Sequence, residues 1–257
     1  MTERSERTDA LRVIRDPLLK VEGLTKSFGG VRGVDGCSFQ VAEGSITAVI
    51  GPNGSGKTTM FNLVTGYLRP DAGRVWFRGR DVTGHDPGRL YRQGLTRTFQ
   101  QARVFAHLTV EENLVVAGGY GWRQVFGRRV GRSDAERAAA LLADLRLAHV
   151  ARLRASELSY GQRKLLEFAA VLMSSPRLVL LDEPTAGVNP VLVETMEAYI
   201  RQRHEAGTTF LVVEHDLNLV MRLCDPVILM DTGRQVFTGS PAEVQASPVV
   251  LEAYLGA

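Results

Sequence analysis

The segment GPNGSGKTT, residues 51–59, constrains the fold of this chain more than any other stretch. It follows a short apolar run, SITAVI, and leads into KTTMFNLVTG, which predicts a strand, a glycine turn and a helix in succession. The spacing matches G-x-x-x-x-G-K-[ST], in which glycines let backbone N–H groups fold inward around phosphate oxygens. The helix N-terminus adds positive potential. The segment therefore predicts a phosphate-binding loop rather than an ordinary glycine turn.

Every residue of this loop is a candidate nucleotide ligand. Lys57 is expected to reach the β- and γ-phosphates, and Thr58 to offer its hydroxyl to Mg²⁺. The full predicted set is Gly51, Pro52, Asn53, Gly54, Ser55, Gly56, Lys57, Thr58 and Thr59.

Two further apolar runs end in residues suited to phosphate chemistry. LVLL leads into Asp182, which suits a Mg²⁺ contact, and Glu183, which suits polarising an attacking water. Alone, these acids could form a surface turn, but the phosphate loop upstream favours catalysis. His215 follows the apolar run FLVV and could hydrogen-bond a γ-phosphate and hold the water.

The composition excludes several classes of protein. A net charge of +3 is too small to indicate a nucleic-acid partner. The two cysteines, Cys37 and Cys224, form no CxxC pattern, which indicates a reducing compartment. The N-terminal stretch lacks the apolar run of a signal peptide, and runs such as LVLL are far shorter than the roughly 20 residues that cross a bilayer. We expect a cytosolic protein whose membrane role comes through a partner.

Strand-like and helical segments alternate in a way that predicts an α/β fold with a doubly wound core. Short β-like segments such as SFQVA and RVWFRG lie between glycine turns near the start, and residues 89 to about 173 are mostly helical in pattern. Two capping boxes support those helices, Thr109 with Glu112 and Ser133 with Glu136. The expected divisions are a flexible arm at 1–17 and one domain at 18–257, with a core at 18–88 and 174–240, an inserted helical part at about 89–173 and C-terminal helices at 241–257.

The segment ELSYGQRKLLEFAAVLM, residues 157–173, predicts a helix with one buried face. The residues of that face are Leu165, Phe168, Ala169 and Leu172, at spacing i, i+3, i+4, i+7. The helix begins at a polar turn, Ser159 to Gln162, for which packing gives no reason. Gln100, in TRTFQQARVF, is by its own sequence context only a solvated glutamine at a junction.

The order of these motifs resembles the ATP-binding-cassette ATPases over nearly the whole chain. The matching segments are the phosphate loop, Gln100, LSYGQ at 158–162, LVLLDE at 178–183, AGVNP at 186–190 and His215. The resemblance implies a RecA-like P-loop core with an antiparallel β subdomain and an inserted α-helical subdomain. It also implies that two copies face each other head to tail, with ATP on one phosphate loop covered by the other copy's signature.

The resemblance assigns roles residue by residue. Phe28 would stack on adenine, and Gln100 would approach Mg²⁺ together with Thr58 and Asp182. Glu183 would be the general base and His215 the switch histidine, and Lys57 completes the catalytic set. The signature that serves the partner's ATP would be Ser159, Tyr160, Gly161 and Gln162.

Three positions depart from the family pattern. Phe28 stands where tyrosine is common, which keeps a stacking face but loses a hydroxyl. Tyr160 replaces the first signature glycine, so this turn is expected to use ordinary backbone angles. Asn189 stands where aspartate is frequent, so the resemblance does not carry over the family's contacts across the dimer at this loop.

Within the family, the details are similar to the ATPases of branched-chain amino acid importers, as in LTVEENLVVA, DEPTAGVNP and the ending LEAYLGA. That similarity implies a second ATPase, identical or different, two membrane permeases, a substrate-binding protein reached through the complex, and a peripheral place at the cytoplasmic face of a bacterial-type membrane. Urea or amide import, lipopolysaccharide export, iron–sulfur assembly and a nucleotide-binding subunit without turnover are the alternatives.

The segment AGGYGWRQVFGRRVGR, which follows the first capped helix, is expected to be a loop. Its arginines, Arg123, Arg128, Arg129 and Arg132, could contact lipid headgroups or a permease, although a plain solvated loop is the favoured interpretation.

Overall fold

The computed structural model describes residues 14–118 and 132–255. The expected arm at 1–17 therefore lies outside the described residues except for 14–17, and Arg123, Arg128 and Arg129 of the arginine-rich segment lie outside them entirely. Arg132 is the first residue of helix α5 rather than part of a loop.

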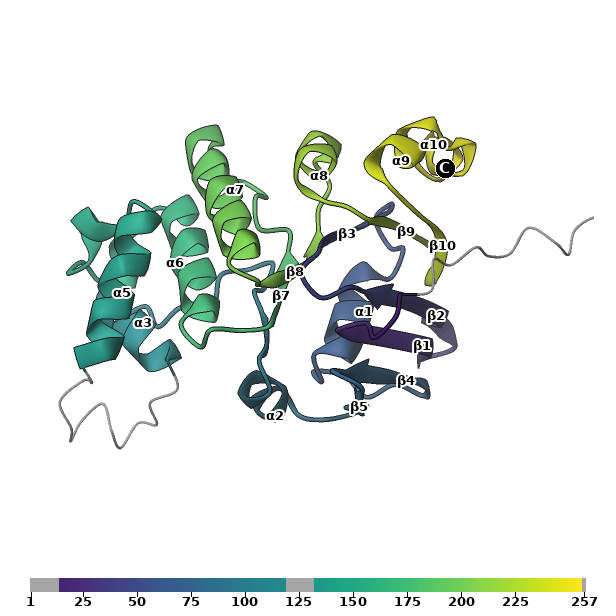
Figure 1. The fold of residues 1–257 in the computed structure, drawn as a ribbon, viewed down its shortest axis with the longest axis horizontal. Coiled ribbons are helices and arrows are strands. Elements are labelled where there is room, and N and C mark those ends of the chain that lie inside the picture. Colours follow the sequence, from purple (N-terminus) through teal and green to yellow (C-terminus); the bar gives the residue numbers. More distant parts are fainter. Residues whose placement is uncertain (1–13, 119–131, 256–257) are drawn as a thin grey trace, which may run out of the picture.

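A six-stranded, mostly parallel sheet forms the centre of the molecule (Figure 1). Only β10 runs antiparallel, along β9 at one edge. In order across the sheet the strands are β10 (Arg234–Gly239), β9 (Val227–Asp231), β3 (Ile46–Ile50), β8 (Thr209–Val213), β7 (Leu178–Asp182) and β6 (Leu95–Arg97). Chain crossovers make the carboxyl ends of the parallel strands meet at one edge, where ligands bind in such folds.

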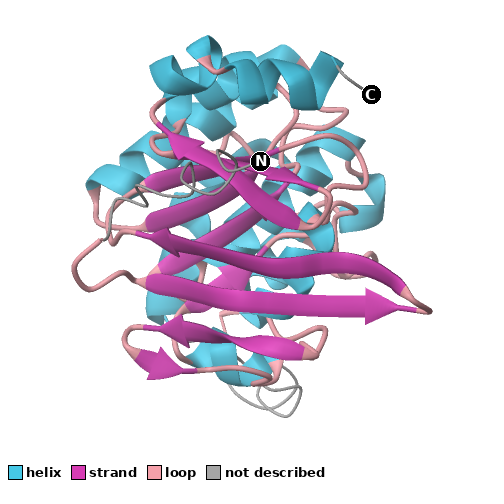
Figure 2. Ribbon diagram, turned by 90° about the vertical axis from the view of Figure 1, so that its right-hand side faces the viewer, coloured by secondary structure: helices cyan, strands magenta, loops and turns pink. Residues whose placement is uncertain are grey.

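A second, antiparallel sheet lies at one end of the molecule, as Figure 2 shows most clearly. Its strands, in order, are β2 (Val31–Val41), β1 (Leu19–Phe28), β4 (Ala72–Phe77) and β5 (Arg80–Asp81). The sequence analysis singled out β2 and β4 but not β1. Strand β1 is irregular at Gly23, which has φ +57° and lies at a register shift, so its sequence shows no clean alternation.

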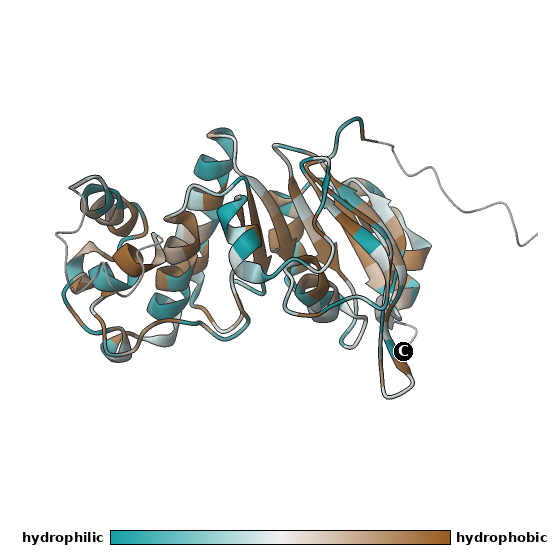
Figure 3. Cartoon of the chain, turned by 90° about the horizontal axis from the view of Figure 1, so that it is seen from below, coloured by the Kyte–Doolittle hydropathy of each residue, from teal (hydrophilic) through white to brown (hydrophobic). Residues whose placement is uncertain are grey.

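The parallel strands are buried on both faces, which explains why they appear in the sequence as continuous apolar runs. Helix α1 (Lys57–Val64) packs between the two sheets, where Phe61 joins a core with Val49 of β3. The neighbouring Ala48 and Ile50 point into a separate core on the other face. Helices α7 (Pro190–Glu205), α8 (Leu217–Leu223), α9 (Pro241–Ala246) and α10 (Pro248–Leu255) lie on that side (Figure 1). Figure 3 shows the central strands as the most hydrophobic ribbon.

Helices α3 (Val110–Ala117), α5 (Arg132–Asp144) and α6 (Tyr160–Leu172) form a helical part at the other end of the molecule (Figure 1). Short 3₁₀ turns at Ala148–Val150 and Ala155–Glu157 connect α5 to α6. The helical stretch expected from residue 89 onward nevertheless contains β6, which pairs with β7 in the central sheet, just after α2 (Pro87–Arg92). With only three residues, two of them polar, β6 leaves no periodic signal in the sequence.

Of the two predicted capping boxes, the structure shows one. Thr109 and Glu112 form the expected capping box at α3. Ser133 cannot cap α5, because that helix already begins at Arg132. In α6 the four residues of the predicted apolar face are all buried, which confirms that interpretation. None of the helices within the described ranges is long and apolar enough to span a lipid bilayer.

Candidate functional site

The phosphate loop requires glycine at two positions because other backbone lies against it. A Cβ at Gly51, whose φ is +148°, would lie 2.0 Å from the carbonyl oxygen of Met230 in β9. A Cβ at Gly56, whose φ is +97°, would lie 2.3 Å from the carbonyl oxygen of Gly33 in β2. The loop is therefore fixed between the two sheets, as expected of a preformed anion site.

Lys57 points back into this loop. Its Nζ donates to the carbonyl oxygens of Gly51 (2.8 Å) and Pro52 (2.9 Å). Burial lowers the pKa of this ammonium, and the carboxylates of Glu183 and Asp182 oppose that shift. Both predicted acids therefore act electrostatically on the predicted phosphate lysine, although more than 120 residues separate them in the chain.

The N-terminus of α1 differs from those of six other α-helices. Gly56 is its N-cap, and within the described residues no side chain caps it. Side chains do cap α2, α3, α6, α7, α8 and α9, through Asp86, Thr109, Ser159, Asn189, Asp216 and Ser240. The first N–H groups of α1 thus have no side-chain acceptor, which suits them to bind a phosphate.

Glu183 lies between Gln100 and His215. Gln100 Nε2 donates to Glu183 Oε2 at 3.0 Å, and His215 Nε2 lies 2.6 Å from Glu183 Oε1. These residues follow β6, β7 and β8, so the sheet edge brings them together. Glu183 has φ +48°, an uncommon angle for a residue with a side chain. The backbone is held there by the bond from Glu183 N to the carbonyl oxygen of Val213 (2.9 Å).

Glu214 is a buried acid that the sequence analysis missed. Its Oε1 accepts hydrogen bonds from Thr185 N (3.0 Å) and Thr185 Oγ1 (2.6 Å), and its Oε2 accepts one from His215 N (3.0 Å). One carboxylate therefore ties the loop after Glu183 to the loop that carries His215.

Arg97, in β6, was also missed, and it fixes the predicted magnesium ligand. Its Nη2 donates to Asp182 Oδ2 at 2.7 Å, and both side chains are buried, at 4% and 2% exposure. Arg97 Nη1 donates to Asn62 Oδ1 at 2.6 Å, and Asp182 N donates to Thr98 Oγ1 at 3.2 Å. No local pattern in the sequence marks Arg97 as buried, since β6 has only three residues.

The donor set fits a magnesium ion carried by phosphates better than a metal bound by protein alone. Mg²⁺ in nucleotide sites takes one or two carboxylates and completes its shell with phosphates and water. Among the described residues no group of three or more His, Cys, Asp or Glu side chains is arranged to hold a metal. Asp182 would supply one carboxylate, and the exposed Thr58 would supply a hydroxyl.

Replacing Arg97 with methionine is expected to destabilise the fold, because it leaves the buried Asp182 carboxylate without its partner. Breaking a buried ion pair costs about 3–5 kcal/mol, which corresponds to a melting temperature lowered by roughly 6–20 °C. Calorimetry of the isolated chain measures this. Arg222→Met is the control, since it removes an exposed arginine that pairs with Glu197, and it should shift the melting temperature little.

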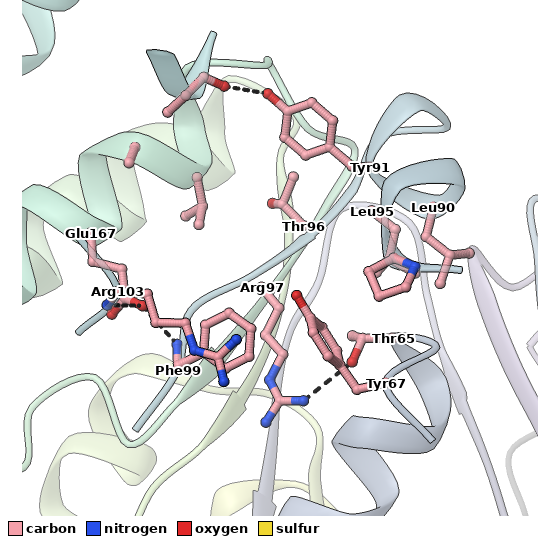
Figure 4. A pocket seen from close by; sticks show the side chains of 14 residues that line it. Thr65, Tyr67, Leu90, Tyr91, Leu95, Thr96, Arg97, Phe99, Arg103 and Glu167 are labelled. Atoms are coloured by element: carbon pink, nitrogen blue, oxygen red, sulfur yellow. Dashed lines mark hydrogen bonds between the residues drawn. The ribbon is translucent and has the colours of Figure 1, made fainter. Parts of the chain in front are cut away.

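A pocket of about 230 Å³ opens beside Arg97, lined by β6, α2 and α6 (Figure 4). The Arg97 guanidinium lies 5.9 Å from the Tyr67 ring centroid and 5.1 Å from that of Phe99. Arg103 stacks 3.7 Å from the Phe99 ring centroid. Glu167, on α6, accepts hydrogen bonds from the backbone N–H groups of Phe99 and Arg103. The pocket therefore adjoins the segment that carries Gln100.

Phe28 ends β1 and is 47% exposed. A Cβ at Gly33 would lie 3.1 Å from Phe28 and 3.5 Å from Thr59, so the ring sits beside α1 and the phosphate loop. An exposed aromatic face at this place is available to a base.

The signature residues lie at the start of α6, on the other side of β7 and β8 from α1 (Figure 1). Ser159 caps the helix, and Tyr160 is absent from the residues with positive φ, which confirms the ordinary backbone expected there. The exposed Tyr160 ring packs beside Gly187. A Cβ added at Gly187 would lie 3.2 Å from the nearest atom of that ring. The structure thus brings together the loop residues, Asp182, Glu183, Gln100 and His215, but leaves the signature apart from them.

Comparisons with known proteins agree with this site. A family model described as ABC transporter matches residues 34–186, and one described as branched-chain amino acid ATP-binding cassette transporter matches residues 234–257. The chain therefore belongs to the ABC transporter family, and it is a nucleotide-binding ATPase cassette of that family.

Several similar proteins are ATP-binding proteins of branched-chain amino acid transport. The chain is 38% identical to the high-affinity branched-chain amino acid transport ATP-binding protein BraF of Pseudomonas aeruginosa, over 93% of this chain and 98% of that protein. It is 41% identical to the probable branched-chain amino acid transport ATP-binding protein LivG of Archaeoglobus fulgidus, over 93% of this chain and 96% of that protein. A crystal structure of a nucleotide-free cassette from an ABC transporter superposes with TM-score 0.83 at 35% identity, covering 94% of this chain and 100% of that one. The crystal structure of an ADP-bound cassette of an ABC transporter superposes with TM-score 0.82 at 35% identity, covering 94% of this chain and 99% of that one.

Proposed function

We propose that this protein hydrolyses ATP to power the import of branched-chain amino acids through membrane permeases that it contacts from the cytoplasmic side. The observation that carries the proposal is Glu183 held between Gln100 and His215 at the edge that also carries the phosphate loop. The relatives named for branched-chain amino acid transport, at 36–41% identity over nearly the whole chain, support this choice of substrate over urea, amides or lipids. They also disfavour iron–sulfur assembly and a subunit without turnover.

The residues of the site divide the chemistry between them. The phosphates of ATP lie on the N–H groups of the loop and on Lys57, which exchanges its carbonyl partners for phosphate oxygens. Thr58, Asp182 and Gln100 would hold Mg²⁺, which neutralises charge developing on the phosphates. Glu183 accepts a proton from the attacking water, which Gln100 helps to position. His215 orients Glu183 and reaches toward the γ-phosphate.

A second cassette, the same or different, completes this site. Ser159 Oγ accepts a hydrogen bond from Gln162 N at 3.3 Å, which leaves its hydroxyl hydrogen free to donate to a phosphate oxygen. The N–H groups of Tyr160 and Gly161 belong to the first turn of α6 and have no acceptor within the helix. Since α6 lies across the sheet from its own phosphate loop, these donors serve the γ-phosphate on the partner cassette. The isolated monomer should therefore turn over slowly.

Phe28→Ala is expected to weaken ATP binding about 5- to 150-fold, because stacking of a base on an aromatic ring contributes about 1–3 kcal/mol. Phe28→Tyr keeps the ring and should bind ATP as the wild type does. Fluorescence titration with a labelled ATP analogue compares the two. Equal affinity of the alanine variant and the wild type would place the adenine elsewhere.

The transported substrate is tested on the complex isolated with its membrane partners. Proteins that co-purify with this chain from native membranes should include permeases rather than soluble assembly factors. In liposomes, phosphate release should rise when the binding protein is loaded with leucine, isoleucine or valine. Stimulation by urea alone, or by a lipid alone, would replace the amino-acid assignment without affecting the assignment as an ATPase.

A further inference from the structure

Helix α6 carries two charged side chains that are buried although they lie in a helix with an apolar face. Lys164 is 3% exposed and Glu167 is 4% exposed. They are three residues apart, so they project from the same side of the helix toward residues 99–103. That segment lies beyond the end of β6 and contains Gln100.

The Glu167 carboxylate binds the backbone N–H groups at the two ends of this segment. Its Oε1 accepts from Phe99 N at 3.0 Å and from Arg103 N at 3.2 Å, as the close-up of the pocket shows (Figure 4). Burial raises the pKa of the Glu167 carboxyl, and the two backbone donors oppose that shift. The segment's backbone donors are thus bound to α6.

Lys164 holds the carbonyl groups of the same region. Its Nζ donates to Gln100 O at 2.6 Å, to Glu183 O at 3.3 Å and to Phe99 O at 3.4 Å. Burial lowers the pKa of this ammonium, while the carboxylates of Glu167, Asp182, Glu183 and Glu214 oppose the shift. One cation on α6 therefore bonds to the backbone of both residues that form the Gln100–Glu183 pair.

We propose that Lys164 is a positioning residue for ATP hydrolysis. By binding the carbonyl groups of Gln100 and Glu183 together, it sets the 3.0 Å hydrogen bond between their side chains. Because Lys164 lies little more than one helical turn from Ser159, any displacement of the signature turn also moves the group that aligns this pair. The alignment of Glu183 therefore depends on how α6 meets the partner's nucleotide. This inference rests on the roles given to Glu183 and Gln100 under the proposed function.

The variant Lys164→Met removes the donors and keeps the length of the side chain. In the complex assembled with its permeases, turnover at saturating ATP should fall about 10- to 100-fold, the cost of misplacing catalytic groups by about 1 Å. The affinity of the isolated chain for ATP should change less than about twofold, since Lys164 directs its hydrogen bonds to Phe99, Gln100 and Glu183 rather than to the nucleotide-binding loop. Arg152→Met, at an exposed arginine of the same helical part, should alter neither quantity.

A double-mutant cycle separates positioning from general weakening of the fold. If Lys164 acts through Gln100, adding Lys164→Met to Gln100→Ala should cost little further turnover. Losses that multiply, wild-type turnover in Lys164→Met, or an equal loss of ATP affinity and turnover would each overturn the proposal. If Lys164→Met does not fold, Lys164→Gln, which retains one donor group, is judged by the same cycle. A wild-type complex without turnover would instead refute the proposed function, so the two failures are distinguishable.

Discussion

Replacing Glu183 with glutamine is expected to lower ATP turnover of the assembled complex about 10²- to 10⁴-fold while ATP remains bound. Glutamine has nearly the same shape and can keep contacts with Gln100 and His215, which lie 3.0 and 2.6 Å from the carboxylate oxygens. It cannot accept the proton of the attacking water, and removing a general base has an effect of this size. The nucleotide recovered from the variant should be ATP rather than ADP.

Phosphate release from the purified complex measures this effect, and chromatography of the extracted nucleotide identifies what is bound. Glu205→Gln, at an exposed acid near the end of α7, is the matched control and should turn over ATP at the wild-type rate. Wild-type phosphate release by the Glu183 variant would show that another group takes the proton.

Lys57→Met is expected to act at the earlier step of nucleotide binding. The ammonium is buried within the phosphate loop, and a hydrogen bond to a charged group contributes about 1.5–3 kcal/mol. ATP affinity should therefore fall about 10- to 150-fold, and turnover at saturating ATP a further 10²- to 10³-fold because a donor to the transferred phosphate is lost. Methionine preserves the volume of the stem, so the fold should survive.

Isothermal titration of ATP into the isolated chain measures the Lys57 effect without any partner. Lys20→Met removes a partly exposed lysine of the antiparallel sheet and should leave the affinity unchanged. Together, the two variants separate the functions of the site, since Glu183→Gln should retain ATP and Lys57→Met should not. Unchanged affinity in Lys57→Met would mean that the loop does not bind the phosphates.

The sequence was sufficient to predict those parts of the site that occupy contiguous segments at strand ends. Asp182 ends a buried strand, and the phosphate loop, Glu183 and His215 follow buried strands. An apolar run ending in polar residues is visible without any structure. The crossovers of a parallel sheet then place these ends at one edge. Gln100 was different, because its own surroundings indicated only solvent, and it entered the site through the family resemblance alone.

The residues that hold the site in place could not be predicted. Arg97 meets Asp182 across 85 residues of sequence, and Glu167 meets Phe99 across 68. The helical spacing of apolar residues predicts which face of a helix is buried. It does not predict which charged residues beside that face are also buried and bonded to other segments. Lys164 and Glu167 are two such charged residues, and both are buried. Such contacts depend on how the helical part meets the sheet, which no local pattern encodes.

ATP hydrolysed at Glu183 is proposed to power amino-acid uptake. The most direct test measures ATP-dependent uptake of radiolabelled leucine and phosphate release in the same vesicles, for complexes containing wild-type chain or Glu183→Gln. Both rates should fall together, by at least about 10²-fold, in the variant. Leucine uptake that continues at the wild-type rate while phosphate release is lost, or phosphate release without any leucine uptake in the wild type, would contradict the account.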